Sequence, residues 1–178
     1  MKIIRMLLLA IAAISLFSIA AGAQTKKKPV KAKSTASKTP TIPPLDVRAA
    51  RAKVDELLGL VTRFATNLEA GAKSIEDIDN EAKLNRVRKQ SLDQNAKDKN
   101  TVINAIRNLR EGMVKLETEF RTKPALKKYL PTIQGISDLA GQAETSAVGG
   151  KFVAANAPIQ SIQQKLTNTL AAMPNVPI

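Results

Sequence analysis

The chain contains no cysteine, no histidine and no tryptophan among its 178 residues. Without cysteine it has no disulfide framework, so packing alone must stabilise the fold. The absence of both histidine and cysteine excludes Ser-His and Cys-His nucleophile pairs, ordinary zinc sites and the usual haem ligands. We therefore expect a protein that is not an enzyme, with no catalytic residue, no metal site and no cofactor.

Aromatic side chains are also scarce, because the chain has only four phenylalanines and one tyrosine. Sheet proteins are enriched in aromatic and β-branched residues, and their strands commonly alternate apolar and polar positions. No run of this alternating kind argues for a strand in the sequence. These two observations predict an all-α fold.

The first 23 residues have three features of a secretory signal peptide, in the expected order. Lys2 and Arg5 give a positive start, residues 6–20 are almost wholly apolar, and residues 21–23 form the small triplet Ala-Gly-Ala. We expect cleavage after this triplet, which makes the mature protein periplasmic or secreted. No later segment is apolar enough to form a transmembrane helix.

An uncleaved membrane anchor is the alternative to cleavage. Residues 6–23 carry no charge, and their length is at the short limit for a helix that crosses a bilayer. The small residues at the end of the run and the serines within it favour cleavage. We therefore assign residues 1–23 to a signal peptide.

Residues 24–45 form a basic segment with almost no large apolar side chain. They contain six lysines, four prolines and no acidic residue. Such a segment cannot offset its ordering entropy by burial, so we expect a disordered linker here. Behind a cleavage site, this linker would serve as a flexible basic tether.

From residue 46 the pattern changes to helical spacing, with apolar residues separated by alternating steps of three and four. The first stripe consists of Val47, Ala50, Val54, Leu57, Val61, Phe64 and Leu68. Asp46 is a candidate N-cap, because its carboxylate can accept hydrogen bonds from free amides. Gly71 is the expected end of this helix, and Ser74 is the expected cap of the next one.

Apolar residues at helical spacing recur from residue 75 to residue 120, but residues 93–101 offer only Ala96. An unbroken helix would be roughly 69 Å long at about 1.5 Å per residue, well beyond its expected partners. The thin stretch is either a solvated helical turn or a loop. We expect a break or a protrusion near residues 97–100.

A third helical pattern follows Pro124 and extends to residue 147. It contains Pro131, which predicts either a kink or a regular helix that starts near residue 130. The glycine pair at residues 149–150 is the expected end of this helix.

The last helical pattern consists of Phe152, Ala155, Ile159, Ile162, Leu166, Leu170 and Met173. Proline is well tolerated in the first turn of a helix, so Pro158 predicts a helix that starts at Asn156. Pro174 is expected to terminate it.

Short connections between these patterns suit antiparallel neighbours. We therefore predict one domain over residues 46–178, an up-and-down antiparallel helical bundle of four to five helices. Heptad-like spacing of this kind is also compatible with a coiled-coil homo-oligomer.

Basic side chains are in excess, with 28 lysines and arginines against 15 acids. The candidate polyanion-binding residues fall into three groups, which are Lys26, Lys27, Lys28, Lys31, Lys33 and Lys38; Lys83, Arg86, Arg88 and Lys89; and Arg121, Lys123, Lys127 and Lys128. Basic residues are also normal on solvated helix faces, where nearby glutamates pair with them. No aromatic residue is interleaved with the groups, so we expect no specific binding of nucleic acid.

Three functions are consistent with these observations. The favoured one is an exported non-catalytic helical-bundle protein that binds a protein partner or a cell-envelope component, which an exposed apolar groove would mark. The first alternative is a structural protein that binds polyanions, such as anionic lipid, lipopolysaccharide or acidic polymers, through its basic groups. The second is an enzyme with a carboxylate-only site, which would place two or more acids in a concave pocket.

Overall fold

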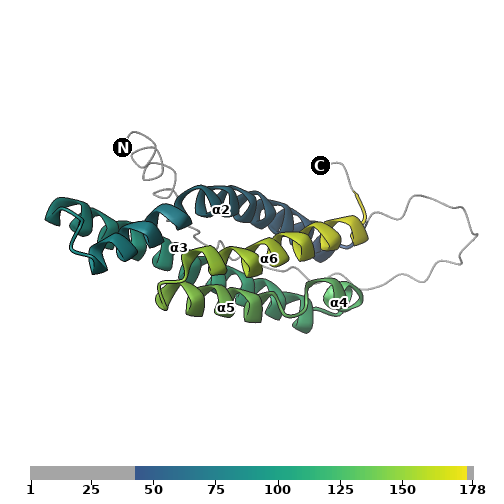
Figure 1. The fold of residues 1–178 in the computed structure, drawn as a ribbon. Helices are drawn as coiled ribbons and strands as arrows, with labels where there is room; N and C mark the ends of the chain where they lie inside the picture. The colour runs from purple at the N-terminus through teal and green to yellow at the C-terminus, as the bar shows by residue number, and fades with distance from the viewer. Residues whose placement is uncertain (1–42, 176–178) are drawn as a thin grey trace, which may run out of the picture. The chain divides into compact units, whose positions relative to one another are not determined.

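The structure is a computed structural model that describes residues 43–175. The expected signal peptide, the six lysines of the linker and residues 176–178 lie outside the described residues. The described part of the chain is all-helical and bundle-like, with five α-helices, one 3₁₀-helix and no strand (Figure 1). The prediction of an all-α fold is therefore confirmed.

Helix α2 spans Leu45–Lys83. Its buried stripe follows the predicted spacing and continues through Leu68, Ala72 and Ile75. The prediction that one helix ends at Gly71 and another begins at Ser74 is wrong. The reason is that the stripe keeps its phase across Gly71, and one glycine costs a helix only about 1 kcal/mol.

Helix α3 spans Lys89–Thr122, so the chain turns at residues 84–88 and not near residues 97–100 as predicted. The turn follows from Asn85, which has a φ of 55°. Asparagine adopts this left-handed conformation more readily than most residues, and a residue in this conformation ends a helix.

The thin stretch at residues 93–101 is helical. Two of its polar residues, Asn95 and Lys99, lie at helical spacing from the buried Val102 and bond to α2 instead of packing on it. Polar contacts therefore continue the stripe where the sequence offers no apolar side chain. The question of helix or loop is settled in favour of a helix.

The third pattern forms three elements, which are the 3₁₀-helix η1 (Pro124–Tyr129), the single-turn α4 (Leu130–Ile133) and α5 (Ile136–Val148). An α-helix does begin at Leu130 as predicted, but it ends after one turn, and the longer helix starts at Ile136. Gly135 causes the difference, because its φ of 86° is left-handed and breaks the helix after α4.

Helix α6 spans Phe152–Ala172 and ends before Pro174 as predicted. The prediction that it starts at Asn156 is wrong, and Pro158 lies inside the helix. The first turn forms because Phe152 and Ala155 are both fully buried. The carbonyl that would bond to the missing N–H of Pro158 belongs to Ala154, an exposed residue that water can reach.

Helices α2, α3, α5 and α6 pack as antiparallel neighbours around one apolar core. Lys53 near the start of α2 bonds to Glu119 near the end of α3. Arg51 of α2 bonds to the carbonyl of Leu170 near the end of α6. Helix α5 packs against both α3 and α6, which closes the set of four (Figure 1).

The role of Gly135 can be tested by alanine substitution. No neighbouring atom would meet a new Cβ there, so Gly135→Ala measures backbone strain alone and is expected to lower the free energy of unfolding by about 1 kcal/mol. Gly59→Ala is the matched control, because Gly59 is an exposed helical residue with the same open surroundings. It should stabilise by about 0.5 kcal/mol. Chemical denaturation measures both; a neutral Gly135→Ala would contradict the left-handed assignment.

Candidate functional site

The α2–α3 hairpin projects beyond the rest of the bundle (Figure 1). The turn between α5 and α6 lies level with Glu76, whose Oε1 accepts a hydrogen bond of 2.8 Å from the N–H of Val153. Beyond that point α2 and α3 have only each other to pack against. Accordingly, no residue between Ile75 and Asn95 is buried.

A polar contact holds the two helices together at the base of this projection. Asp79 of α2 accepts hydrogen bonds from Asn95 at 2.8 Å and from Lys99 at 2.9 Å. The Asn95 side chain also donates to the carbonyl of Ile75 at 3.2 Å. These bonds join two helices at a level where apolar burial has ended, and they orient the end of the hairpin.

The end of the hairpin, residues 82–92, is here named the hairpin tip. It carries one of the predicted basic groups, Lys83, Arg86, Arg88 and Lys89, and two exposed acids, Glu81 and Asp93, flank it directly. All four side chains are exposed, and none forms an ion pair with another described residue. The tip also exposes Leu84, which is 60% accessible, and Leu92.

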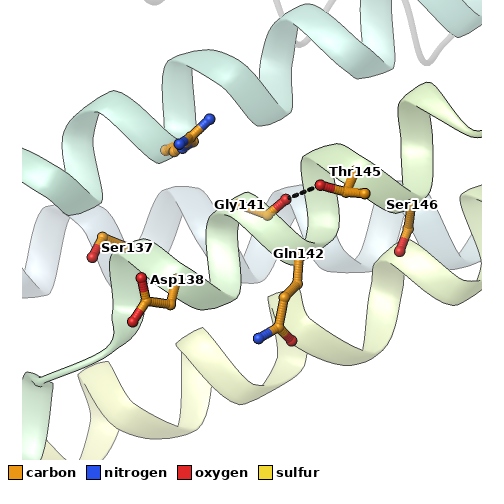
Figure 2. A pocket seen from close by; sticks show the side chains of 7 residues that line it. Ser137, Asp138, Gly141, Gln142, Thr145 and Ser146 are labelled. Carbon is orange, nitrogen blue, oxygen red and sulfur yellow. Dashed lines mark hydrogen bonds between the residues drawn. The ribbon is translucent and has the colours of Figure 1, made fainter.

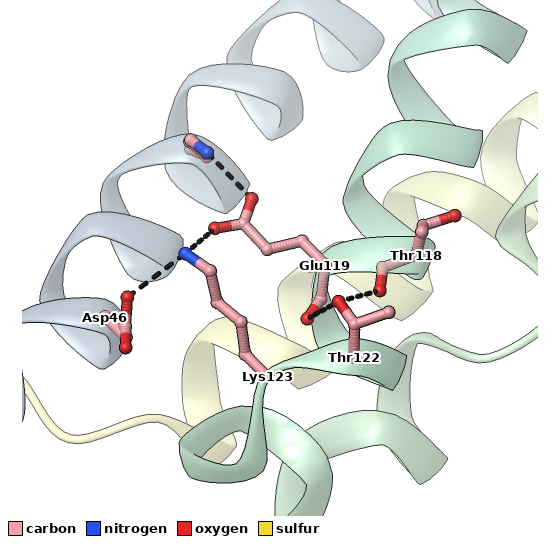
Figure 3. A network of polar contacts seen from close by, with 6 residues as sticks. Asp46, Thr118, Glu119, Thr122 and Lys123 are labelled. Atoms are coloured by element: carbon pink, nitrogen blue, oxygen red, sulfur yellow. Dashed lines mark hydrogen bonds and ion pairs between the residues drawn. The ribbon is translucent and has the colours of Figure 1, made fainter. Parts of the chain in front are cut away.

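Two of the four residues in the other predicted basic group of the described chain, Arg121 and Lys123, are paired with acids, and Figure 3 shows the contacts of Lys123. Lys123 Nζ lies 2.6 Å from Glu119 Oε1 and 3.1 Å from Asp46 Oδ1, and Lys53 bonds to the second oxygen of Glu119. The prediction that Asp46 caps α2 is wrong, because the helix begins at Leu45 and Asp46 lies inside its first turn, where its carboxylate bonds to Lys123. Arg121 Nη2 lies 2.9 Å from Glu117 Oε1.

The pKa values within this network follow from the same contacts. Burial alone would raise the pKa of Glu119, but hydrogen bonds from Lys123 and Lys53 outweigh burial and hold that pKa below its ordinary value. The hydrogen bonds to Glu119 and Asp46 raise the pKa of Lys123. These lysines serve the fold, and they are less available to an external anion.

The two remaining residues of this group, Lys127 and Lys128, are exposed on η1. The ammonium of Lys128 lies 4.8 Å from the centroid of the Tyr129 ring, a cation–π contact. Because α3 has 34 residues, its ends are about 51 Å apart at about 1.5 Å per residue. The two basic groups lie at opposite ends of α3 and therefore do not form one continuous surface.

A shallow polar hollow of about 680 Å³ lies between α3 and α5 (Figure 2). Its lining consists of Arg110, Ser137, Asp138, Gly141, Gln142, Thr145 and Ser146. Beside it, Arg107 and Arg110 bond to the two oxygens of Glu144 at 2.9 and 2.8 Å, and these bonds lower the pKa of Glu144. The hollow is not the apolar groove that would mark a protein-binding module.

Three charged side chains have roles that sequence reasoning missed, because each caps a helix distant in sequence. Glu76 of α2 accepts a hydrogen bond from a backbone N–H in the first turn of α6. Arg51, also on α2, donates hydrogen bonds to backbone carbonyls at the end of α6. Glu117 accepts from the N–H groups of Gly135 and Ser137 at the start of α5. Each charge has the sign that the helix dipole favours at that end.

Glu117 is the one buried acidic side chain within residues 43–175. Burial raises its pKa, but hydrogen bonds from Ser137 and Gly135 and the charge of Arg121 outweigh burial and hold the pKa below its ordinary value. The inward-facing pair of acids expected of a carboxylate enzyme is therefore not present in the described core. No group of three or more acids positioned to hold a metal ion occurs among the described residues either.

None of the helices that the structure describes has the length and apolar character needed to cross a membrane. Comparisons with protein-family models, with curated proteins and with solved structures found no match for this chain.

Proposed function

We propose that this chain is an exported, non-catalytic, up-and-down helical-bundle protein that binds a component of the cell envelope through the hairpin tip. The observation that carries this proposal is the tip itself, which projects from a packed bundle with four exposed basic side chains and two exposed leucines. Residues 24–45 would act as a basic tether behind the cleaved signal peptide. The bundle then serves as the rigid support of the tip.

The absence of a catalytic role is part of this proposal. Within residues 43–175 one carboxylate, that of Glu117, is buried in the core. It accepts hydrogen bonds from Gly135 and Ser137, which fixes the start of α5. The polar hollow on α5 is lined by hydroxyl, amide and charged groups, and its Ser137 hydroxyl donates to Glu117, the carboxylate that also accepts from the first N–H groups of α5. A binding role uses the features that the described chain does have, which are exposed charge and exposed apolar side chains on a projecting element.

The second candidate is a polyanion-binding structural protein in which the linker lysines dominate. The observation that favours it is their number, because residues 24–45 hold six lysines and no acid. The two candidates differ in which residues carry the attraction. One experiment can therefore separate them.

The test is retention of the protein on envelope membranes of the producing cell. The variant K83Q/R86Q/R88Q/K89Q is expected to bind at least about tenfold more weakly, since each basic residue near an anionic surface contributes about 1 kcal/mol. The matched control R48Q/R63Q/K115Q/K151Q also removes four exposed charges, so both variants lower the formal net charge by four. Co-sedimentation at low and high salt measures retention.

Equal losses in the two variants would show that net charge, and not the tip, holds the protein. A loss confined to a variant with all six linker lysines changed to glutamine would favour the second candidate. The intact mass of the recovered protein tests export in the same sample: a chain that begins at Gln24 is expected, and one that begins at Met1 would indicate a retained anchor.

A further inference from the structure

The shape of the hairpin tip limits what it can bind. A small molecule needs a concave site that covers most of its surface. The tip is two helices wide, and no residue between Ile75 and Asn95 is buried, so it is convex and cannot enclose a ligand. Its target must therefore be an extended surface.

The charge of the tip gives the sign of that surface. Lys83, Arg86, Arg88 and Lys89 lie within seven consecutive positions, and they outnumber the two exposed acids that flank residues 82–92, Glu81 and Asp93. Arginine and lysine bind phosphate oxygens strongly, and each such side chain near an anionic lipid surface strengthens binding about fivefold. The target is therefore anionic, and phosphate is the group that these side chains fit.

The exposed Leu84 distinguishes between two kinds of anionic target, an acidic polymer and a lipid bilayer. Leu84 is 60% accessible and stands directly beside Lys83 in the turn. A hydrated acidic polymer has no apolar region to receive a leucine, whereas a bilayer has one just below its headgroups. Transfer of a leucine side chain from water to an apolar region strengthens binding roughly 10- to 100-fold.

We infer that the hairpin tip docks on the surface of an anionic phospholipid bilayer, with its basic side chains on the phosphates and Leu84 inserted below them. This inference rests on the proposed envelope-binding function and names the component that is bound. The axis of the hairpin then points toward the membrane, and the four-helix part stands off from it.

The test uses the absence of tryptophan from the chain. Leu84→Trp introduces a single fluorescent reporter at the tip, and Val114→Trp places the matched control at an exposed position in the second half of α3, far from the tip. The probe is vesicles of phosphatidylcholine with roughly one third phosphatidylglycerol, enough to give a negative surface potential. Both tryptophan variants are expressed from the full-length sequence and purified in the form that the cell produces. Thermal melts check that both variants fold.

The emission of Leu84→Trp is expected to shift to shorter wavelength and to be quenched by brominated acyl chains. The emission of Val114→Trp should change little. Because the linker lysines attract vesicles as well, sedimentation alone cannot locate the contact, and the reporter position does. Adding K83Q/R86Q/R88Q/K89Q should weaken the fluorescence-detected binding at least about 30-fold, the effect that results when two of the four removed charges contribute about fivefold each.

Sedimentation with vesicles without a shift at position 84 would overturn the inference and leave the envelope-binding proposal intact. The same holds if the protein binds envelope membranes but not these vesicles, since a different component would then be the target. A shift at position 84 with heparin or polyphosphate that equals the shift with vesicles would assign the tip to soluble acidic polymers instead. No retention on either vesicles or envelope membranes would overturn both.

Discussion

Phe152→Ala is expected to lower the free energy of unfolding by about 4 kcal/mol, the range for removing a fully buried phenylalanine side chain. Phe152 is the first residue of α6 and is 0% exposed, so its ring fixes the start of that helix in the core. The variant should also loosen the turn before Pro158, because the helix has no capping side chain of its own there. Denaturant titration measures the loss, and amide exchange locates it.

Val153→Ala is the control for Phe152→Ala. Val153 is the next residue in the same turn and is exposed, so its change should stay within about 0.5 kcal/mol. Similar losses in both variants would mean that the first turn of α6 is not anchored by the Phe152 ring. The start of α6 near Asn156, which the sequence pattern predicts, would then be favoured.

Glu117→Ala is expected to destabilise the protein by about 3 kcal/mol, because it leaves the N–H groups of Gly135 and Ser137 without their charged acceptor. The hydroxyl of Ser137, which donates to the same carboxylate at 2.6 Å, loses its partner as well. Arg121→Gln is the control, since its side chain is 61% exposed and its ion pair should contribute less than about 1 kcal/mol.

The pH dependence of stability gives a second measure of Glu117. Its pKa in the folded state is lower than its ordinary value of 4.5, so ionised Glu117 stabilises the fold fully above that value. This contribution is lost as the pH falls through the lower pKa of the folded state. Glu117→Gln should therefore show a weaker loss of stability with acid than the native chain. Parallel acid profiles would contradict the role assigned to this carboxylate.

Much of the bundle could be predicted from apolar spacing alone. The stripes of α2 and α6 are buried nearly as the sequence indicates, and Leu57 and Phe64 are the half-buried members of the first. Helix boundaries were predicted less well. The sequence pattern places a helix end at Gly71 and a helix start just before Pro158, yet continuous burial on both sides of each residue outweighs its local cost.

The position of the turn between α2 and α3 could not be predicted from the spacing of apolar residues alone. The helix continues where apolar residues are missing because Asn95 and Lys99 supply polar contacts with Asp79, a partner that spacing cannot identify. The candidate residues Lys83 and Lys123 look alike in sequence. Only the fold shows that acids surround the second, whereas the first has an amide of Asn80 as its partner.

The length of the projecting hairpin also sets the distance between its tip and the four-helix part of the bundle. Because no residue between Ile75 and Asn95 contributes to the buried core, insertions or deletions of whole turns there would alter the reach of the tip without altering the packing of the bundle. Seven residues added to each helix would lengthen the hairpin by about 10 Å. A change in the length of this segment would therefore change how far from its target the bundle is held.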